Sequence, residues 1–482
     1  MVFLSCLLSA LLLVVSFPQT GWSFLAWGAL IPLFYILDGQ KPWRAFRRAY
    51  LFGFLFFAAT LGWFVYVTYV GAVLLVAFIS LYAALFGLAF VHFQRLGLIP
   101  RIFVLSATWV ALEFIRAHFL TGFGWVMLGH SQYKNIWLIQ MADKTGVYGV
   151  SFLVILANLL IFETLRARSL LLKANIIVLA IFSSVLIYGW RVSGEKENYK
   201  TVKVGIVQPN IPLAVDWDES LKPWIVDKNI QLTKKLRDQK LDLIIWPETS
   251  LPGVISDSPD LTGEIRATAV RMGTPVLIGS IAQEGEHFYN SAFLIGADGQ
   301  MLGRYDKIHL VPFGEYLPLR PVLGWINKFV PLDDFTSGKN YKIFSIAPTN
   351  AKFAVLICFE DTLGYLRRHF AQAGAEFFVN MTNDAWFGDT KAPFLHLQAA
   401  VFGCVENHRS LARAANTGVS ALVDPWGRII ATVIDGHGKR TLIEGTAEGV
   451  LPLVQEKTFY TKYGDIFTYL CFLCILVAVA TL

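Results

Sequence analysis

The sequence has few charged residues and few cysteines for its length. Only 16% of its 482 residues are charged, 55% are hydrophobic and the mean hydropathy is +0.52, which is too apolar for an ordinary soluble protein. The five cysteines give no disulfide framework, because only Cys358 and Cys404 lie outside the apolar runs. A bridge between those two is the alternative, and we do not expect it. Much of this chain is therefore expected to lie in lipid.

Three kinds of binding signature are also missing. Residues 200–455 carry 25 basic and 27 acidic side chains, so the net charge of +6 comes from the apolar remainder and no basic stripe indicates a nucleic-acid site. The nine histidines show no metal-ligand spacing, and no glycine-rich phosphate loop occurs. We expect no metal, no cofactor and no nucleic-acid partner.

Eight apolar runs approach or reach the length that crosses a membrane. They cover residues 3–17, 21–37, 49–70, 71–91, 102–119, 146–165, 174–191 and 464–482. The first run has no basic residue before it and no cleavage pattern after it, so we expect a membrane helix there and not a signal peptide. The sequence therefore predicts seven spans in residues 1–195, a soluble domain in 200–455 and a C-terminal membrane helix in 460–482.

The loops between these runs differ in charge. Three alternate loops hold nine basic residues, namely Lys41, Arg44, Arg47, Arg48, Arg95, Arg101, Arg166, Arg168 and Lys173. The opposite loops hold only Lys134 and Lys144. Because positive loops stay in the cytoplasm, we expect both termini there. Residues 200–455 then lie on the far side of the membrane, which in a bacterium is the periplasm.

Two polar features stand out in the membrane part. Glu113 and Arg116, one turn apart on an expected helix, form either a buried pair or part of a polar site, and we favour the pair. The loop 122–132 is rich in glycine and aromatic residues, which is typical of a segment at the lipid interface. There, His130 and Gln132 would contact a head group or serve only as part of an anchor.

Strand and helix patterns alternate through residues 200–455. Strands are expected at 201–208, 241–246, 275–281, 288–295, 352–357, 376–382 and 419–424, and helices at 219–237, at 261–272, after Thr362 and at 392–408. This alternation predicts one α/β domain with a largely buried sheet.

Three polar residues lie at or near the ends of expected strands. Glu248 follows one strand, Lys307 lies among apolar and aromatic residues, and Cys358 directly follows the buried run 353–357. Side chains at neighbouring strand ends converge at one edge of an α/β sheet, so we expect these three to meet. Glutamate would take the thiol proton, and lysine with the N–H of Phe359 would stabilise the oxyanion that forms when the thiolate attacks an acyl carbon. The alternative is an ion pair beside a buried cysteine, and spacing alone does not decide between them.

Three motifs resemble the signature of the nitrilase superfamily and occur in its order. They are Trp246-Pro247-Glu248, the run from Tyr305 to Glu315, and Ile357-Cys358-Phe359-Glu360. The eight-span frame and the run Asn383–Gly388 are similar to the apolipoprotein N-acyltransferase family of Gram-negative inner membranes. The resemblance extends over essentially the whole chain. It implies an α-helical membrane domain of eight spans joined to a nitrilase-like α-β-β-α sandwich.

The resemblance implies catalytic roles for particular residues. Glu248 would be the general base, Lys307 the oxyanion group and Cys358 the acylated nucleophile. Glu315 and Glu360, together with Phe359, would support them. Many family members have tyrosine where this chain has Phe359, so any role of that hydroxyl is absent here.

The resemblance and the composition also indicate residues that bind substrate. Trp217 matches a tryptophan on a flexible arm of the family, and Trp386 belongs to the shared run 383–388. Asn383 and Asp384 would shape the pocket near the nucleophile or cap a turn. Tyr316 opens the apolar stretch 316–331, which would either dip into the membrane interface or pack on the domain.

The reaction of this family has two halves. A fatty acyl group passes from a phospholipid, usually phosphatidylethanolamine, to the cysteine as a thioester, and then to the α-amine of the diacylglyceryl cysteine of a lipoprotein. We therefore expect a phospholipid donor, a diacylglyceryl-prolipoprotein acceptor and a monomeric membrane enzyme. A membrane-anchored amidase and a non-catalytic scaffold or transporter are the alternatives. Eight spans disfavour the first, and the intact Glu248, Lys307 and Cys358 disfavour the second.

Overall fold

The computed structural model of the chain describes residues 1–167, 172–194, 199–213, 219–317 and 334–482. The chain divides into two compact units. Unit 1 comprises Met1–Lys196, Thr390–Glu406 and Thr458–Leu482, and unit 2 comprises Glu197–Asp389 and Asn407–Lys457.

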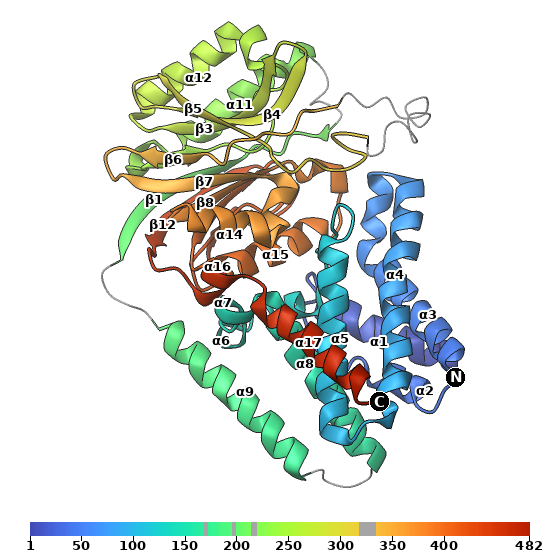
Figure 1. Cartoon of the computed structure of the whole chain (residues 1–482). Coiled ribbons are helices and arrows are strands. Elements are labelled where there is room, and N and C mark those ends of the chain that lie inside the picture. Colours follow the sequence, from blue (N-terminus) through green and yellow to red (C-terminus); the bar gives the residue numbers. More distant parts are fainter. Residues whose placement is uncertain (168–171, 195–198, 214–218, 318–333) are drawn as a thin grey trace. The chain divides into compact units, whose positions relative to one another are not determined.

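Unit 1 is helical. Its elements are α1 (Val2–Ser16), η1 (Ser23–Trp27), α2 (Ile31–Leu37), α3 (Pro42–Leu61), η2 (Gly62–Tyr66), α4 (Tyr69–His92), η3 (Phe93–Arg95), α5 (Leu98–His118), η4 (Leu128–Gln132), α6 (Ile136–Ile139), α7 (Ala142–Thr145), α8 (Val147–Ala167), α9 (Leu172–Val192), most of α15 (Ala392–Asn407), α16 (Phe459–Tyr463) and α17 (Ile466–Ala480). The short η elements are 3₁₀ helices. Figure 1 shows α3 and α4 side by side, with α5, α8 and α17 forming a second group.

Five stretches of unit 1 are long and apolar enough to cross a membrane, within the part of the chain that the structure describes. They are Pro42–Tyr66, Tyr69–Arg95, Leu98–His118, Val147–Ala167 and Leu172–Val192. Val2–Ser16, Ser23–Leu37 and Ile466–Ala480 are apolar but shorter. Five of the expected spans thus coincide with helices of crossing length, and the count of eight stays a prediction.

Small residues allow α3 and α4 to pack closely. A Cβ atom added to Gly53 of α3 would lie 2.7 Å from the Cβ of Ala83, and one added to Gly87 of α4 would lie 2.6 Å from the Cβ of Ala49. Close backbone approach through small side chains is the usual basis of helix association in lipid, where apolar burial gives no net gain. Larger residues at these two glycines would separate the pair.

The prediction that a loop holds the first group of basic residues is wrong. Helix α3 begins at Pro42, before the apolar run, so Arg44, Arg47 and Arg48 lie in its first two turns. Proline is well suited to the first turn of a helix, because its fixed φ fits and its missing N–H has no helical partner there. Long arginine stems can follow apolar surface while the charge stays in water.

Two ion pairs connect three of the charged segments in unit 1. Arg101 at the start of α5 pairs with Glu163 near the end of α8 at 2.7 Å, and Arg166 pairs with Asp38 after α2 at 3.2 Å. These contacts bring the end of α2, the start of α5 and the end of α8 to the same end of the unit. The side of a membrane on which this end lies stays a prediction.

Unit 2 contains two six-stranded sheets. In spatial order, the first has β12 (Gly445–Leu453), β1 (Lys200–Gln208), β2 (Leu243–Ile245), β3 (Val276–Glu284), β4 (His287–Ile295) and β5 (Met301–Asp306), and the second has β11 (Ile429–Thr432), β10 (Ala421–Val423), β9 (Ser410–Ala415), β8 (Phe377–Thr382), β7 (Ala351–Ile357) and β6 (Ile343–Ile346). Its helices are η5 (Glu219–Leu221), α11 (Lys222–Lys234), η6 (Arg237–Gln239), η7 (Ile255–Asp257), α12 (Pro259–Met272), η9 (Cys358–Thr362), α14 (Gly364–Gln372) and η10 (Asp384–Phe387).

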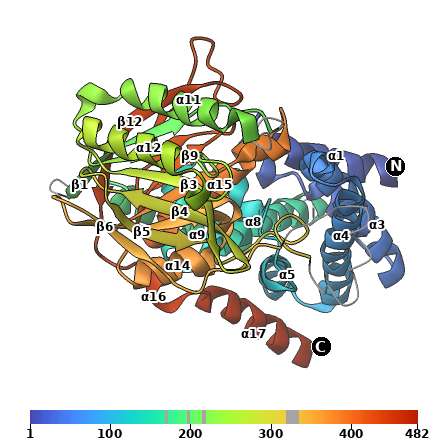
Figure 2. The same cartoon turned by 90° about the horizontal axis from the view of Figure 1, so that it is seen from above.

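The two sheets of unit 2 pack face to face, with β1 against β9 and β4 against β7. Helices α11 and α12 cover the outer face of the first sheet, and α14 lies on the outer face of the second (Figure 1). Figure 2 shows α11 and α12 running alongside one another above the first sheet. Apolar residues such as Val226 of α11 and Ile265 of α12 join the core beneath them. The result is the α-β-β-α sandwich that the resemblance implies.

The single sheet expected from the alternating pattern is wrong. Strands buried on both faces read as apolar runs whether they belong to one sheet or to two, so the pattern does not distinguish the cases. The sequence also missed β5, β6, β9, β11 and β12. Strand β9 is Ser-Leu-Ala-Arg-Ala-Ala, without a β-branched residue, and β12 contains Gly449 and Pro452. Tertiary pairing therefore overrides a weak local preference.

Candidate active site

Cys358 stands where β7 ends and η9 begins. The preceding residues 353–357 are fully buried, whereas Cys358 is half-buried. Its φ is +53°, in the left-handed region that residues with a side chain rarely adopt. Such strain is held in place only by surrounding contacts and gathers at functional sites. This turn lies at the carboxyl end of β7, between β6 and β8 in the second sheet.

Glu248 lies just after β2 of the first sheet and is held by two hydrogen bonds. Its Oε1 accepts from Asn290 Nδ2 at 2.8 Å, and its Oε2 accepts from the main-chain N–H of Asn383 at 2.8 Å. A glycine at 279 makes room, because a Cβ there would lie 2.6 Å from the nitrogen of Thr249. Burial raises the pKa of Glu248 above its usual range, with Lys307 opposing that shift.

Lys307 follows β5 and is 1% exposed. Its Nζ lies 2.8 Å from Glu315 Oε1 and 3.8 Å from Glu248 Oε1. Burial by itself would lower the pKa of Lys307, but the Glu315 carboxylate, with Cys358 and Glu248, outweighs burial and raises that pKa. The ammonium is therefore charged at neutral pH.

Glu248 and Lys307 both influence the pKa of the Cys358 thiol. Burial and the Glu248 carboxylate raise the pKa of Cys358, whereas the Lys307 ammonium lowers it, and the net shift is upward. The nucleophile is the thiolate, but at neutral pH Cys358 is mostly in the thiol form. A base is therefore needed to remove its proton. A neighbouring carboxylate whose own pKa is raised is suited to that task.

Asn290 was missed by the sequence analysis. It lies on β4, and its Nδ2 donates to Glu315 Oε1 at 2.9 Å as well as to Glu248. Glu315 also accepts from the main-chain N–H of Val311 at 2.8 Å. The amide thus fixes both carboxylates around Lys307. The available signal was an amide side chain inside an otherwise largely apolar strand.

Glu360 ties the segment after β5 to the end of β7. It is fully buried and accepts from the main-chain N–H groups of Ile308, His309 and Ile357 at 2.7, 3.0 and 2.8 Å, and from the hydroxyl of Tyr305 at 3.0 Å. Burial raises its pKa to about 7, while the main-chain donors oppose the shift. Because Lys307 precedes Ile308 and Cys358 follows Ile357, this carboxyl holds both segments of the candidate site.

Replacing Glu360 by glutamine should destabilise the chain. One amide N–H₂ would face main-chain donors, which leaves at least one of them unpaired and lowers the unfolding temperature by roughly 2–10 °C. The raised pKa of Glu360 means that the folded chain keeps a proton that the unfolded chain releases, so this residue's contribution to stability falls as pH rises from about 4.5 to about 7. Glutamine should remove that pH dependence.

Thermal unfolding of the detergent-solubilised chain at pH 5 and pH 8 measures both effects. Glu284→Gln is the control, because that carboxylate is exposed and pairs only with Arg304 among the bonds described. The control should unfold like the original chain. An unchanged unfolding temperature for Glu360→Gln would show that the carboxyl holds neither segment.

The structure places the remaining predicted residues as follows. Asn383 caps η10, accepting from the N–H of Ala385, and Asp384 is 1% exposed and accepts from Thr382 Oγ1 at 2.9 Å. Trp386 is exposed, and Tyr316 is half-buried. Trp217 and residues 318–331 lie outside the described residues. The turn-capping alternative thus holds for Asn383, and the substrate-binding roles stay predictions.

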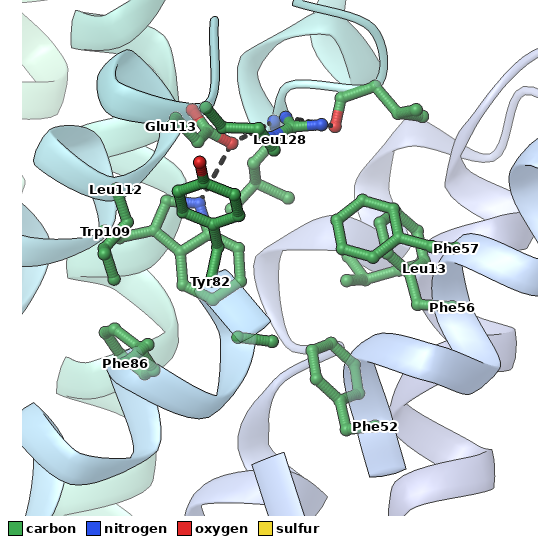
Figure 3. Close-up of a pocket in the computed structure, with 13 residues that line it drawn as sticks. Leu13, Phe52, Phe56, Phe57, Tyr82, Phe86, Trp109, Leu112, Glu113 and Leu128 are labelled. Carbon is green, nitrogen blue, oxygen red and sulfur yellow. Dashed lines mark hydrogen bonds between the residues drawn. The ribbon is translucent and has the colours of Figure 1, made fainter. Parts of the chain in front are cut away.

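Glu113 and Arg116 help to line an apolar pocket in unit 1, together with aromatic residues such as Phe57 and Trp109 (Figure 3). Glu113 Oε1 accepts from the N–H of Leu128 at 2.7 Å and from Trp109 Nε1 at 3.0 Å. Arg116 Nη1 donates to the carbonyl of Trp125 at 2.8 Å. Glu113 and Arg116 therefore each bind the backbone of residues 125–128. The expected ion pair between these two side chains is wrong.

The expectation that the loop 122–132 lies at the lipid interface is also wrong for its second half. Residues 125–132 are buried, with His130 at 5% and Gln132 at 0% exposure. Gln132 donates to the carbonyl of Ser23 at 2.9 Å and accepts from the indole of Trp27 at 3.1 Å. These polar contacts inside the unit satisfy groups that a head group would otherwise bind.

Two packed sheets between helical layers, with glutamate, lysine and cysteine near the strand ends, define a protein of the carbon-nitrogen hydrolase class. The family model described as "Carbon-nitrogen hydrolase" matches residues 203–446, and the one described as "Apolipoprotein N-acyltransferase N-terminal domain" matches residues 9–160. The chain belongs to the apolipoprotein N-acyltransferase family. This confirms the resemblance found in the sequence.

Curated relatives named apolipoprotein N-acyltransferase are similar along nearly their whole length. The relative from Geobacter metallireducens is 36% identical, covering 97% of this chain and 93% of its own. The relative from Methylococcus capsulatus is 33% identical, with 96% and 92% covered, and that from Chlorobaculum tepidum is 29% identical, with 96% and 93% covered. The similarity to these relatives therefore extends over both the helical membrane part and the catalytic part of this chain.

Proposed function

We propose that this protein is an apolipoprotein N-acyltransferase that uses Cys358 as its nucleophile. It would move a fatty acyl group from a phospholipid, with phosphatidylethanolamine as the expected donor, to the α-amine of a lipoprotein's diacylglyceryl cysteine. The observation that carries the proposal is the meeting of Glu248, Lys307 and Cys358 in a chain with helices of membrane-crossing length. The full-length similarity to enzymes of that name supports the substrates.

In the first half-reaction, Glu248 takes the proton of the Cys358 thiol. The thiolate attacks the ester carbonyl of the phospholipid, and Lys307 with the N–H of Phe359 stabilises the oxyanion. The C–O bond then breaks, and Glu248 returns the proton to the departing lysophospholipid oxygen. A thioester on Cys358 remains.

In the second half-reaction, the neutral α-amine of the acceptor attacks the thioester carbonyl. Glu248 takes a proton from the attacking nitrogen, the same oxyanion donors act again, and the C–S bond breaks. The amide product forms and Cys358 leaves as a thiolate, which regains its proton from Glu248. Donor and acceptor thus react in turn at one nucleophile, which is a ping-pong mechanism.

A transfer assay with two acceptors tests this function. A diacylglyceryl peptide with a free α-amine should receive the acyl chain from phosphatidylethanolamine, whereas the same peptide with an acetylated amine should receive none. A chain that releases free fatty acid at the same rate with either peptide would be a lipid hydrolase. Cleavage of small amides without any lipid reaction would favour the amidase alternative.

The proposed topology has eight spans, with membrane segments in residues 1–195 and 460–482 and a periplasmic catalytic domain in residues 200–455. We propose a monomer in a bacterial inner membrane with both termini in the cytoplasm. The shared side of the charged segments, tied by Arg101–Glu163 and Arg166–Asp38, supports this orientation.

Reporter fusions test the topology. Alkaline phosphatase fused after Lys200 should be active, because it folds only in the periplasm, whereas the same reporter fused after Leu482 should be inactive. Green fluorescent protein should give the opposite result at each site. Activity of one reporter at both positions would contradict a membrane span between Lys200 and Leu482. Inactive phosphatase after Lys200 would contradict an odd number of spans before the catalytic domain.

A further inference from the structure

Arg413 is a buried charged residue that the proposed mechanism does not use. It lies on β9 and has 0% exposure. Removing a guanidinium from water is costly unless its donors are paired, and a buried ion pair gives little net stability in return. A fully buried arginine in a strand of small residues is therefore expected to have a specific task.

The donors of Arg413 reach three elements. Nη1 lies 3.1 Å from Asp361 Oδ2 and also donates to Asn380 Oδ1, and Nη2 lies 3.0 Å from Asp384 Oδ2. Nε donates to the carbonyl of Val419 at 3.2 Å. Asp361 belongs to η9, Asn380 to β8 and Asp384 to η10. The guanidinium thus joins the turns that follow β7 and β8.

One arm of this network ends on the nucleophile. Asn380 is fully buried, and its Nδ2 donates to the carbonyls of Leu356 at 2.9 Å and Cys358 at 3.1 Å. Leu356, Asn380 and Arg413 are direct register partners across β7, β8 and β9. The arginine therefore fixes the amide that holds the carbonyl of the residue with φ of +53°. Its bond to Asp361 holds the far end of the same turn.

The other arm reaches the base. Asp384 accepts hydrogen bonds from Arg413 and from Thr382 Oγ1. Asn383, which lies between Thr382 and Asp384 in the sequence, donates its N–H to Glu248 Oε2 at 2.8 Å. The space around Asp384 is tight, because a Cβ at position 418 would lie 2.0 Å from its Oδ2. One side chain thus restrains the turns on which both the nucleophile and the base depend.

We infer that Arg413 is a positioning residue: by binding Asn380, Asp361 and Asp384, it holds Cys358 in its left-handed turn beside Glu248 and Lys307. The consequence for acyl transfer rests on the proposed function. The consequence for the thiol does not, since it concerns only where Cys358 stands. A thiol that leaves this position loses the burial and the Glu248 carboxylate, which together raise its pKa more than the Lys307 ammonium lowers it.

Alkylation of the intact detergent-solubilised chain by iodoacetamide, followed at Cys358 by peptide mass spectrometry from pH 6 to 10, tests this inference. Arg413→Lys keeps the charge but cannot make the same fork of bonds. It should release the thiol from the burial and the Glu248 carboxylate that raise its pKa, so the Cys358 alkylation profile should shift to lower pH by about one unit and alkylation at pH 7 should become about tenfold faster. The charged groups that face the thiol, Glu248, Lys307 and Asp384, are unchanged in this variant.

Arg409→Lys is the matched control. Arg409 directly precedes β9 and is also buried, at 2% exposure, but its guanidinium donates only to main-chain carbonyls among the bonds described, such as those of Ala375 and Gln455. It should lose thermal stability as Arg413→Lys does and keep the original alkylation profile. Equal shifts in the two arginine variants would overturn the inference, because general loosening would then explain both.

Asn380→Ser provides a second route if Arg413→Lys does not fold. It removes the link between Arg413 and Cys358 without changing any charge, and it should speed alkylation at pH 7 by a similar factor. In the double variant the two effects should not add, since both break one connection. A folded Asn380→Ser chain with the original profile, or effects that add fully in the double variant, would contradict the inference. None of these outcomes depends on acyl transfer.

Discussion

Cys358→Ser should abolish the acyl-enzyme and lower acyl transfer by at least about 10³-fold. The thiol sits on a strained turn beside Glu248 and Lys307, and a hydroxyl there would hold its proton far more tightly. Serine adds no volume and makes similar backbone contacts, so the chain should still fold. Loss of rate would then report on chemistry and not on stability.

The rate with fluorescent phosphatidylethanolamine and a diacylglyceryl peptide measures this effect. Cys474→Ser serves as the control, because that thiol is exposed on α17 and the mechanism does not involve it. The control should transfer acyl chains at the original rate. A Cys358→Ser chain that transfers at a comparable rate would show that another residue carries the acyl group.

Glu248→Gln should lower the rate by about 10²- to 10⁴-fold. The pKa of the Cys358 thiol is raised, so at neutral pH little thiolate exists without a base. The pKa of Glu248 is itself raised by burial, which means that activity of the original chain should fall as pH drops through that raised value. Glutamine cannot accept the proton and should remove this acidic limb.

The pH dependence gives the sharper readout for this variant. Below the pKa of the thiol, the residual rate of Glu248→Gln should rise about tenfold for each pH unit, because hydroxide must now remove the proton. Glu264→Gln, on the exposed side of α12, should keep both the rate and the pH profile of the original chain. A Glu248→Gln chain whose low rate does not change with pH would contradict the role of base.

The sequence identified the catalytic candidates by position, but the route by which they meet differs from the expectation. Glu248 and Lys307 follow β2 and β5, which are not neighbours in the first sheet, and Cys358 follows β7 of the second sheet. Convergence therefore takes place across the two layers of the sandwich. Apolar strand patterns give the ends of strands but not which sheet a strand joins.

The residues that position the three catalytic candidates were harder to predict from the sequence. Asn290, Asn380 and Arg413 each lie within a strand. Apart from Val419, the partners of their side chains described above are 22 to 52 positions away in the sequence, from Asn380 and Cys358 to Arg413 and Asp361. A local signal did exist, because an amide or guanidinium inside a buried strand must be paired. That signal shows that a partner exists but not which residue it is.

In the membrane part, too, the sequence predicted some features correctly and others not. Long apolar runs such as 71–91 and 146–165 correspond to α4 and α8, because length and hydropathy suffice for those. The run 21–37 instead breaks into η1 and α2. Glu113 and Arg116 were recognised as unusual, but spacing of one turn could not show that each binds the backbone of residues 125–128.

Intact-protein mass spectrometry after incubation with phosphatidylethanolamine is the decisive measurement of acyl transfer through Cys358. We expect a mass increase of one fatty acyl group, located by peptide mapping on Cys358 and removed by a diacylglyceryl peptide with a free α-amine. No adduct on Cys358, or an adduct that water discharges equally well with and without that peptide, would contradict acyl transfer through this cysteine.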